Sequence, residues 1–472
     1  MAEFEGREVV GTKKEFAIYL AVNAGIGYGL YNILGNMTQT VAATIFIALV
    51  IGTLMFWRFR VAIAFVGVVL LLLTKTIDLE HTVSFMSVDV IIFLVGMMVI
   101  VGMLRRTGFF RWLLAQGLKL SKFEPRRLMI IMLALAAVMA ALVDEVTSIL
   151  FVCALVFDLC DFFKLNPIKY LIAVVLATNI GSSWTVLGNP IGIMIALRSG
   201  LTFEDFLVTA MPVGVVSLIA LMGIVLFWMR KDLVSLKEQV GTFSGEERLN
   251  FLNELCTIEN KGLFKGSAII FIAVIISLGL HYRVESALGL EHNTLLVGTS
   301  ILGAGIVMLW QRHLARELLM RDVDWWTLIF FMFLFAKAGA LAYVGVTDLI
   351  GEALYSASGG GNVAFLIVLV LWISGFTSAA CDNVLVVATF VPVLQYLSEQ
   401  LGSNVLWWAL LFGGCYGGNM TMVGSTANIV ALGVLEDRGG FHMTLKYWIK
   451  IGLLGSLIPM AIGTLALIIL FT

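Results

Sequence analysis

The chain has 472 residues, of which 60% are hydrophobic and only 13% are charged. Soluble domains carry about a quarter charged residues, so this composition excludes a water-soluble globular protein. The formal net charge of −1 gives no indication of a nucleic-acid partner. Unbroken apolar runs of roughly 20 residues predict membrane-spanning helices, whereas a membrane β-barrel would show shorter, alternating segments.

The first 126 residues are predicted to form an N-terminal tail and scaffold helices. The tail mixes acidic and basic residues and has no short apolar core followed by a small-residue cleavage site, so we expect it to stay in the cytoplasm. The apolar runs predict helices at about 16–35, 38–57, 60–76 and 88–104. With the N-terminus inside, the basic residues after the second and fourth helices fall in the cytoplasm, where short loops are enriched in Lys and Arg.

Residues 127–229 are predicted to form the first of two repeats. It comprises a hairpin over 127–163, a broken helix over 170–197 and a helix over 207–229. The hairpin has basic flanks on both sides and Asp144-Glu145 in its middle, so we expect it to enter from the cytoplasm, turn within the membrane and return. The broken helix has glycine, proline, hydroxyl and amide residues at its centre, and such a backbone is tolerated at membrane depth only where it lines a cavity or is buried in protein.

The second half repeats this order after a polar segment. We predict a cytoplasmic loop over 230–262, second-half scaffold helices over 263–345, and the second repeat over 362–472, with a hairpin at 362–400, a broken helix at 404–435 and a helix at 447–471. The basic residues make the second hairpin enter from outside, so the repeats are inverted and the C-terminus lies outside.

Short motifs confirm the duplication within the sequence. Asp144-Glu145-Val146 matches Asp382-Asn383-Val384, and the tract that begins at Trp184 matches the tract that begins at Met420, at offsets of 238 and 236 residues. Inverted repeats in an apolar chain are typical of secondary transporters, whose substrate site lies between the repeats. The predicted fold is an all-α polytopic membrane protein with two re-entrant hairpins and two interrupted transmembrane helices.

The acids at the hairpin tips are the first candidates for function. A charged side chain at the centre of a bilayer costs about 3 kcal/mol on insertion scales, so such residues usually face a cavity and mark an ion or proton path. We therefore expect Asp144 and Asp382 to couple transport to protons. The alternative is that each acid only caps its turn by accepting backbone N–H bonds, and the two roles are compatible.

Polar residues of the tips and broken helices complete the predicted substrate or ion site, because interrupted helices expose free N–H and C=O groups. Alternatively, the Ser and Thr residues only satisfy the helix breaks. The predicted site comprises Asp144, Glu145, Thr147, Asn179, Ser182, Ser183, Thr185, Asn189, Cys381, Asp382, Asn383, Asn419, Thr421, Ser425, Thr426 and Asn428.

Three side chains, Cys381 of this set together with Cys415 and Lys337, have alternative interpretations. Cys381 and Cys415 are soft ligands or, more commonly, small buried hydrophobes. For Lys337 three roles are open: it partners an acid or the substrate, it extends to the membrane surface, or it forms a structural ion pair. The sequence contains no P-loop, HExxH or CxxC motif, so we predict no enzyme, no metal site and no cofactor.

These motifs resemble the ion transporter superfamily, especially the ArsB/NhaD permease group that includes arsenite exporters and the P protein. The resemblance rests on the two tip motifs, on Thr178-Asn179-Ile180-Gly181 with Gly188-Asn189-Pro190, and on Gly417-Gly418-Asn419 with Gly424-Ser425-Thr426-Ala427-Asn428. It implies a homodimer in which a mobile transport domain moves against a fixed scaffold as an elevator. The group commonly has Gly-Asp-Pro-Pro-Asn at the first helix break, so Asn189 here replaces an acid.

The combined prediction is a proton-coupled antiporter in the plasma (inner) membrane. Acids at both tips disfavour a multiply charged anion, because like charges repel strongly in a low dielectric. We expect export of a neutral arsenite- or antimonite-type metalloid in exchange for H⁺. A Na⁺/H⁺ antiporter is the alternative, followed by a dicarboxylate or other organic-anion carrier and by an ion channel.

Overall fold

The structure is a computed structural model that describes residues 13–255, 257–258, 260–438 and 443–472. Every regular element within these ranges is a helix, which confirms the predicted all-α fold. Ten of the helices in the described ranges are long and apolar enough to cross a membrane. The chain is thus a multi-pass membrane protein, while the N-terminal tail before residue 13 lies outside the described residues.

The chain divides into two compact units. The first contains residues up to Ile91 together with Asp324–Leu354. Its helices are α1 (Lys13–Leu34), α2 (Met37–Met55), η1 (Trp57–Phe59), α3 (Arg60–Leu73), α4 (Leu79–Ser84), α18 (Trp325–Tyr343) and most of α19 (Val346–Ala357). Local polar residues set the helix starts: the side chain of Asn36 accepts the backbone N–H groups of Thr38 and Gln39 at the start of α2.

The second unit contains Ile92–Val323 and Tyr355–Thr472, and all the predicted site residues belong to it. Its first part comprises α5 (Val88–Arg106, which begins in the first unit), α6 (Phe109–Ser121), α7 (Pro125–Leu142), α8 (Glu145–Phe162), α9 (Ile168–Gly181), α10 (Pro190–Ser199), α11 (Phe203–Asp205), η2 (Phe206–Ala210) and α12 (Met211–Trp228). Next come α13 (Arg230–Thr242), α14 (Gly245–Leu255), α15 (Lys261–Leu288), α16 (Thr294–Trp310), α17 (Ala315–Glu317) and η3 (Leu318–Asp322). Its last part comprises α20 (Val363–Ala380), α21 (Asn383–Leu401), α22 (Val405–Gly417), η4 (Gly418–Met420), α23 (Thr426–Asp437) and α24 (Leu445–Phe471).

The polar segment after α12 is helical where it is described. Both α13 and α14 lie within the stretch predicted as a loop. In α13 the buried residues Leu233, Leu236 and Val240 follow helical spacing and form one apolar stripe. An amphipathic helix of this kind satisfies its backbone internally and still exposes a polar face, so its polar composition is compatible with regular structure.

Two helix pairs with a short break between them form the hairpins. α7 ends before Val143 and α8 begins after Asp144, whose side chain accepts the Thr147 N–H at 2.7 Å. α20 and α21 are separated in the same way, and Asp382 accepts the Val384 N–H at 3.0 Å. Each tip acid is therefore an N-cap, and each turn occurs where a carboxylate can satisfy the first orphan donors of the next helix.

Two further helices are interrupted in the middle. α9 and α10 are separated at 182–189, and α22 and α23 at 418–425 by η4 and a turn. Asn189 caps α10 ahead of Pro190, and Ser425 caps α23. Proline suits the first helical position because its missing N–H is not needed there.

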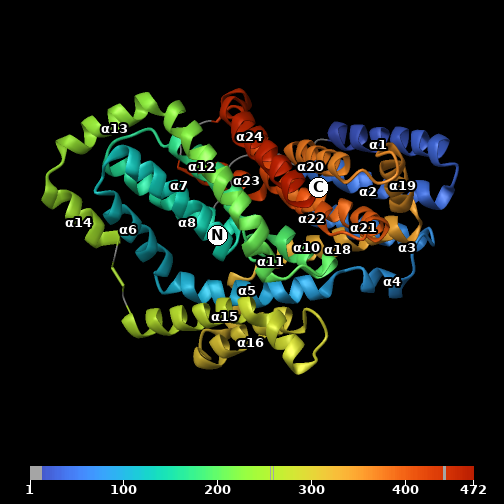
Figure 1. Ribbon diagram of the computed structural model, residues 1–472, viewed down its shortest axis with the longest axis horizontal. Helices are drawn as coiled ribbons and strands as arrows, with labels where there is room; N and C mark the ends of the chain where they lie inside the picture. The colour runs from blue at the N-terminus through green and yellow to red at the C-terminus, as the bar shows by residue number, and fades with distance from the viewer. Residues whose placement is uncertain (1–12, 256, 259, 439–442) are drawn as a thin grey trace. The chain divides into compact units, whose positions relative to one another are not determined.

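The packing of these helices is duplicated (Figure 1). α7 packs on α8 and α9 and against α12, just as α20 packs on α21 and α22 and against α24. The copies also exchange partners: α8 packs on α23, and α21 packs on α10. Such reciprocal contacts indicate an approximate internal two-fold relation within the second unit.

Glycines allow the equivalent helices to approach closely in both copies. A side chain on Gly181 of α9 would collide with the backbone of Ala137 in α7, and one on Gly417 of α22 would collide with the backbone of Gly375 in α20. The broken helices are thus held directly against the first arms of their hairpins, which positions the helix breaks beside the hairpin tips.

Candidate functional site

The two hairpin tips meet at Glu145 and Asn383. The Asn383 amide nitrogen lies 3.4 and 3.5 Å from the two carboxylate oxygens of Glu145. Glu145 is 1% exposed and Asn383 is fully buried. The amide oxygen of Asn383 has no hydrogen-bond partner among the described residues. A carboxylate and an unpartnered carbonyl oxygen in a buried place form an acceptor site for a ligand that donates hydrogen bonds.

Glu145 lies among polar and acidic groups. Its carboxylate also interacts with Asn189 at the first helix break, and it lies within electrostatic range of Asp382 and Asp144. Neither Glu145 nor the two aspartates forms an ion pair with a basic side chain in the part of the chain that the structure describes. Burial of Glu145 and Asp382 without a basic partner, with Asp144 close by, favours the presence of a proton or another positive species nearby.

The two tip aspartates have different surroundings. Asp382 is 4% exposed; one of its oxygens accepts the Val384 N–H and the other accepts the hydroxyl of Thr426. The residue of the first repeat that corresponds to Thr426 is Pro190, which has no donor, and Asp144 is partly exposed. The second tip acid therefore accepts a hydroxyl from its helix break that the first tip acid lacks.

Four predicted residues form an amide cluster between the broken helices. The Asn179 amide nitrogen donates to the amide oxygens of Asn419 at 2.8 Å and Asn428 at 2.9 Å, and its oxygen accepts the Ser425 hydroxyl at 3.0 Å. Asn419 and Asn428 donate in turn to backbone carbonyls, two each. The donors and acceptors of this cluster are taken up within the protein, so it binds the broken helices together.

A second contact between the broken helices is related to the first by the repeat. Asn189 donates to the Ser182 hydroxyl at 3.0 Å and to the Cys415 sulfur at 3.1 Å. The pair Asn189 and Cys415 corresponds, at an offset of 236 residues, to the pair Ser425 and Asn179. Cys415 is therefore a structural partner at the position where the other repeat has an asparagine.

The remaining predicted residues have local roles. The hydroxyls of Thr185 and Thr421 donate to the backbone carbonyls of Ala141 and Ala379, which ties each helix break to its hairpin. Ser183 donates to the buried hydroxyl of Tyr416, a residue that no motif or charge pattern singles out. Thr147 contributes its backbone N–H to Asp144. Cys381 is buried beside Asp382.

Lys337 lies in the first unit and is 1% exposed. Its ammonium donates to the carbonyl of Ile63 at 3.4 Å and has no carboxylate partner among the described residues. A Cβ on Gly67 would lie 2.5 Å from the Lys337 nitrogen, so this glycine makes the space for the lysine. Lys337 thus neither extends to the surface nor forms the ion pair considered for it.

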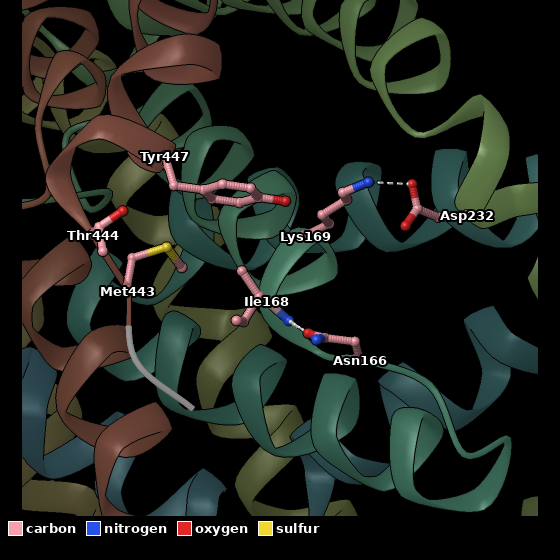
Figure 2. A pocket seen from close by; sticks show the side chains of 7 residues that line it. All are labelled: Asn166, Ile168, Lys169, Asp232, Met443, Thr444 and Tyr447. Atoms are coloured by element: carbon pink, nitrogen blue, oxygen red, sulfur yellow. Dashed lines mark hydrogen bonds and ion pairs between the residues drawn. The ribbon is translucent and has the colours of Figure 1, made fainter. Parts of the chain in front are cut away.

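A cavity of about 300 Å³ lies at the ends of α9, α13 and α24 (Figure 2). Figure 2 shows Lys169 pointing toward Asp232, at 2.6 Å, with Tyr447 on the other side of the lysine. None of the predicted site residues lines this cavity. The candidate site at the hairpin tips and this cavity are therefore separate features of the second unit.

Duplicated hairpins and broken helices that surround buried acids define a membrane transporter. The profile of the family described as "Citrate transporter" (CitMHS) matches residues 44–413, so the chain belongs to that family. This result confirms the predicted transporter class and the predicted group of permeases.

The curated relatives agree with this assignment. An uncharacterized transporter of Mycobacterium tuberculosis is 32% identical over 366 residues, which cover 76% of this chain and 80% of the relative. The P protein of Homo sapiens is 26% identical over 467 residues, which cover 83% of this chain and 54% of that protein. Among solved structures, the YdaH transporter of Alcanivorax borkumensis has a TM-score of 0.53 at 16% identity, with 82% of this chain and 86% of that chain covered, so it shares the fold.

Proposed function

We propose that the chain is a proton-coupled secondary transporter and that Glu145 is the group for which proton and substrate compete. The observation that carries this proposal is the buried contact between Glu145 and Asn383 from opposite hairpins, with the amide oxygen left unpartnered. Asp382 has a hydrogen bond on each oxygen, whereas Glu145 has two long contacts with Asn383 and an interaction with Asn189. Asp144 and Asp382 remain the proton-coupling residues predicted from sequence, and Glu145 joins them.

The substrate that suits these groups is a neutral solute with several hydroxyls, such as arsenous acid. Its O–H groups donate to the Glu145 carboxylate and to the Asn383 carbonyl oxygen, and the amide N–H donates to one of its oxygens. A proton on Glu145 removes the acceptor that the substrate needs. Proton and substrate then exclude each other, which is the requirement for exchange and supports export of the metalloid against H⁺.

The mechanical part of the proposal is alternating access. The hairpins and broken helices form the transport domain, the inverted repeats give it equivalent inward- and outward-facing arrangements, and an elevator movement in a homodimer of the plasma membrane carries the site across. The reciprocal packing of α8 on α23 and of α21 on α10 supports movement of these elements as one body.

Citrate is the second candidate, because the matching family is described as a citrate transporter. A citrate trianion beside three acids, two of them buried, is strongly repelled unless protons or cations accompany it. Because of this repulsion, citrate ranks below the neutral metalloid as a candidate substrate. Exchange of Na⁺ for H⁺ is the third candidate.

Flux into proteoliposomes with an internal pH dye tests the proposal. We expect arsenite flux that needs a pH gradient, and Glu145→Gln should lower it to below about a tenth, since a hydrogen bond to a charged group is worth about 1.5–3 kcal/mol. Asp158→Asn, which changes a partly exposed acid on the same helix α8, is the matched control and should transport normally. Proton-coupled citrate flux without arsenite flux would show that citrate, and not the metalloid, is the substrate. Flux of either solute without proton movement would refute the proton coupling.

A further inference from the structure

Glu145 and Asn383 are equivalent residues of the two repeats. They are separated by 238 residues, the same offset that relates Asp144 to Asp382, and they contact each other. Equivalent residues touch only where they lie on the axis that relates the two copies. The internal two-fold of the second unit therefore passes between an acid and an amide.

A symmetric site would carry two acids at this contact. Two carboxylates a few ångströms apart repel each other unless they share a proton or hold a cation between them. The amide of Asn383 removes the second charge and keeps nearly the shape of an aspartate. The contact then contains one group that titrates and one that does not.

We propose that Asn383 is the specificity-determining residue that keeps this site selective for a proton and a neutral ligand and prevents it from binding a monovalent metal cation. This inference rests on the proposed function. It assigns the preference of the site for a proton over a metal cation to one side chain. The residue acts through the absence of a charge opposite Glu145.

The hydrogen bonds of Asn383 distinguish it from the structural asparagines. Asn179 has a partner on both ends of its amide, and Asn419 and Asn428 each donate twice and accept once. Asn383 has only the two long contacts with Glu145 and an unpartnered oxygen, although it is fully buried. A residue present only for packing would not need an amide at this place.

The first test uses Na⁺ alone on the purified full chain. Asn383→Asp should gain a rise in melting temperature of about 2–4 °C in NaCl relative to choline chloride at equal ionic strength, and the wild type should not. The matched control is Glu145→Gln/Asn383→Asp, which again has one acid and one amide and should show no Na⁺-specific rise. A rise in the wild type, or none in Asn383→Asp, would overturn the inference.

The second test measures flux and does not depend on Na⁺ binding. If the contact works as a pair, the proton-coupled flux of Glu145→Gln/Asn383→Asp should be at least about fivefold higher than that of Glu145→Gln. A double variant that folds, as judged by its melting temperature, but transports no better than Glu145→Gln would refute the pair. Loss of proton coupling in the wild type would instead refute the proposed function and leave the Na⁺ result to decide the inference.

Discussion

At the scale of single residues, adjacent acids have different surroundings. Asp144 is the cap of α8 and is partly exposed, whereas Glu145 is the first residue of the same helix and is 1% exposed. The cap leaves the first helical turn pointing toward the opposite hairpin, so Glu145 reaches Asn383. The local geometry of a helix start thus divides the two carboxylates between capping the helix and contacting Asn383.

Lys337 provides the first residue-scale prediction. Lys337→Ala should raise the melting temperature or leave it unchanged, because an ammonium buried against one carbonyl is costly. Gly67→Ala should destabilise the wild type by about 1–3 kcal/mol, since its Cβ would overlap the lysine. The double variant removes that overlap and should recover most of the loss. Additive losses in thermal unfolding would show that the two residues are not coupled.

At the scale of elements, the helix breaks are held by backbone contacts. Gly181 and Gly417 allow α9 and α22 to touch the first arms of the hairpins, and Thr185 and Thr421 then donate to the same arms near the tips. These four contacts occur at equivalent places of both repeats. They fix the breaks beside the tips and so assemble the site.

The second prediction follows from this packing. Gly181→Ala and Gly417→Ala should each destabilise the protein by about 1–3 kcal/mol and lower the folded yield, because the added methyl meets backbone that cannot rotate away. Gly223→Ala in α12 is the matched control, since its Cβ would meet nothing within 4 Å. It should be neutral or stabilise the helix by about 0.5–1 kcal/mol in thermal unfolding.

At the scale of the whole molecule, the membrane orientation predicted from Lys and Arg stays a prediction. Two exposed positions of the second unit offer convenient markers. The polar segment with α13 and α14 is expected in the cytoplasm, and the end of α24 is expected outside. Glu246 and Thr472 are exposed in these two places.

Cysteine labelling checks this orientation. Cys153, Cys160, Cys381 and Cys415 are buried, so a Cys256→Ser background should label weakly. In intact cells an impermeant maleimide should label Thr472→Cys and spare Glu246→Cys until the membrane is opened. The reverse pattern would invert the topology, and labelling of both from outside would contradict the inverted repeat.

The class of the protein could be read from the sequence because it depends on local composition. Apolar runs of sufficient length, basic flanks and glycine or proline in the middle of a run each report on the backbone around them. The repeat motifs at offsets of about 236 residues also predicted that tips and breaks occur twice. The helices α13 and α14 were missed because a polar amphipathic helix resembles a loop in composition.

The division of labour among the polar residues was decided only by tertiary structure. Asn179 and Asn383 are both buried amides in conspicuous motifs, and nothing local distinguishes them. Their roles depend on partners more than 230 residues away, which satisfy every donor and acceptor of Asn179 and leave the oxygen of Asn383 free. A sequence shows which groups can form hydrogen bonds, whereas the fold determines which of them are already formed and which remain available to a ligand.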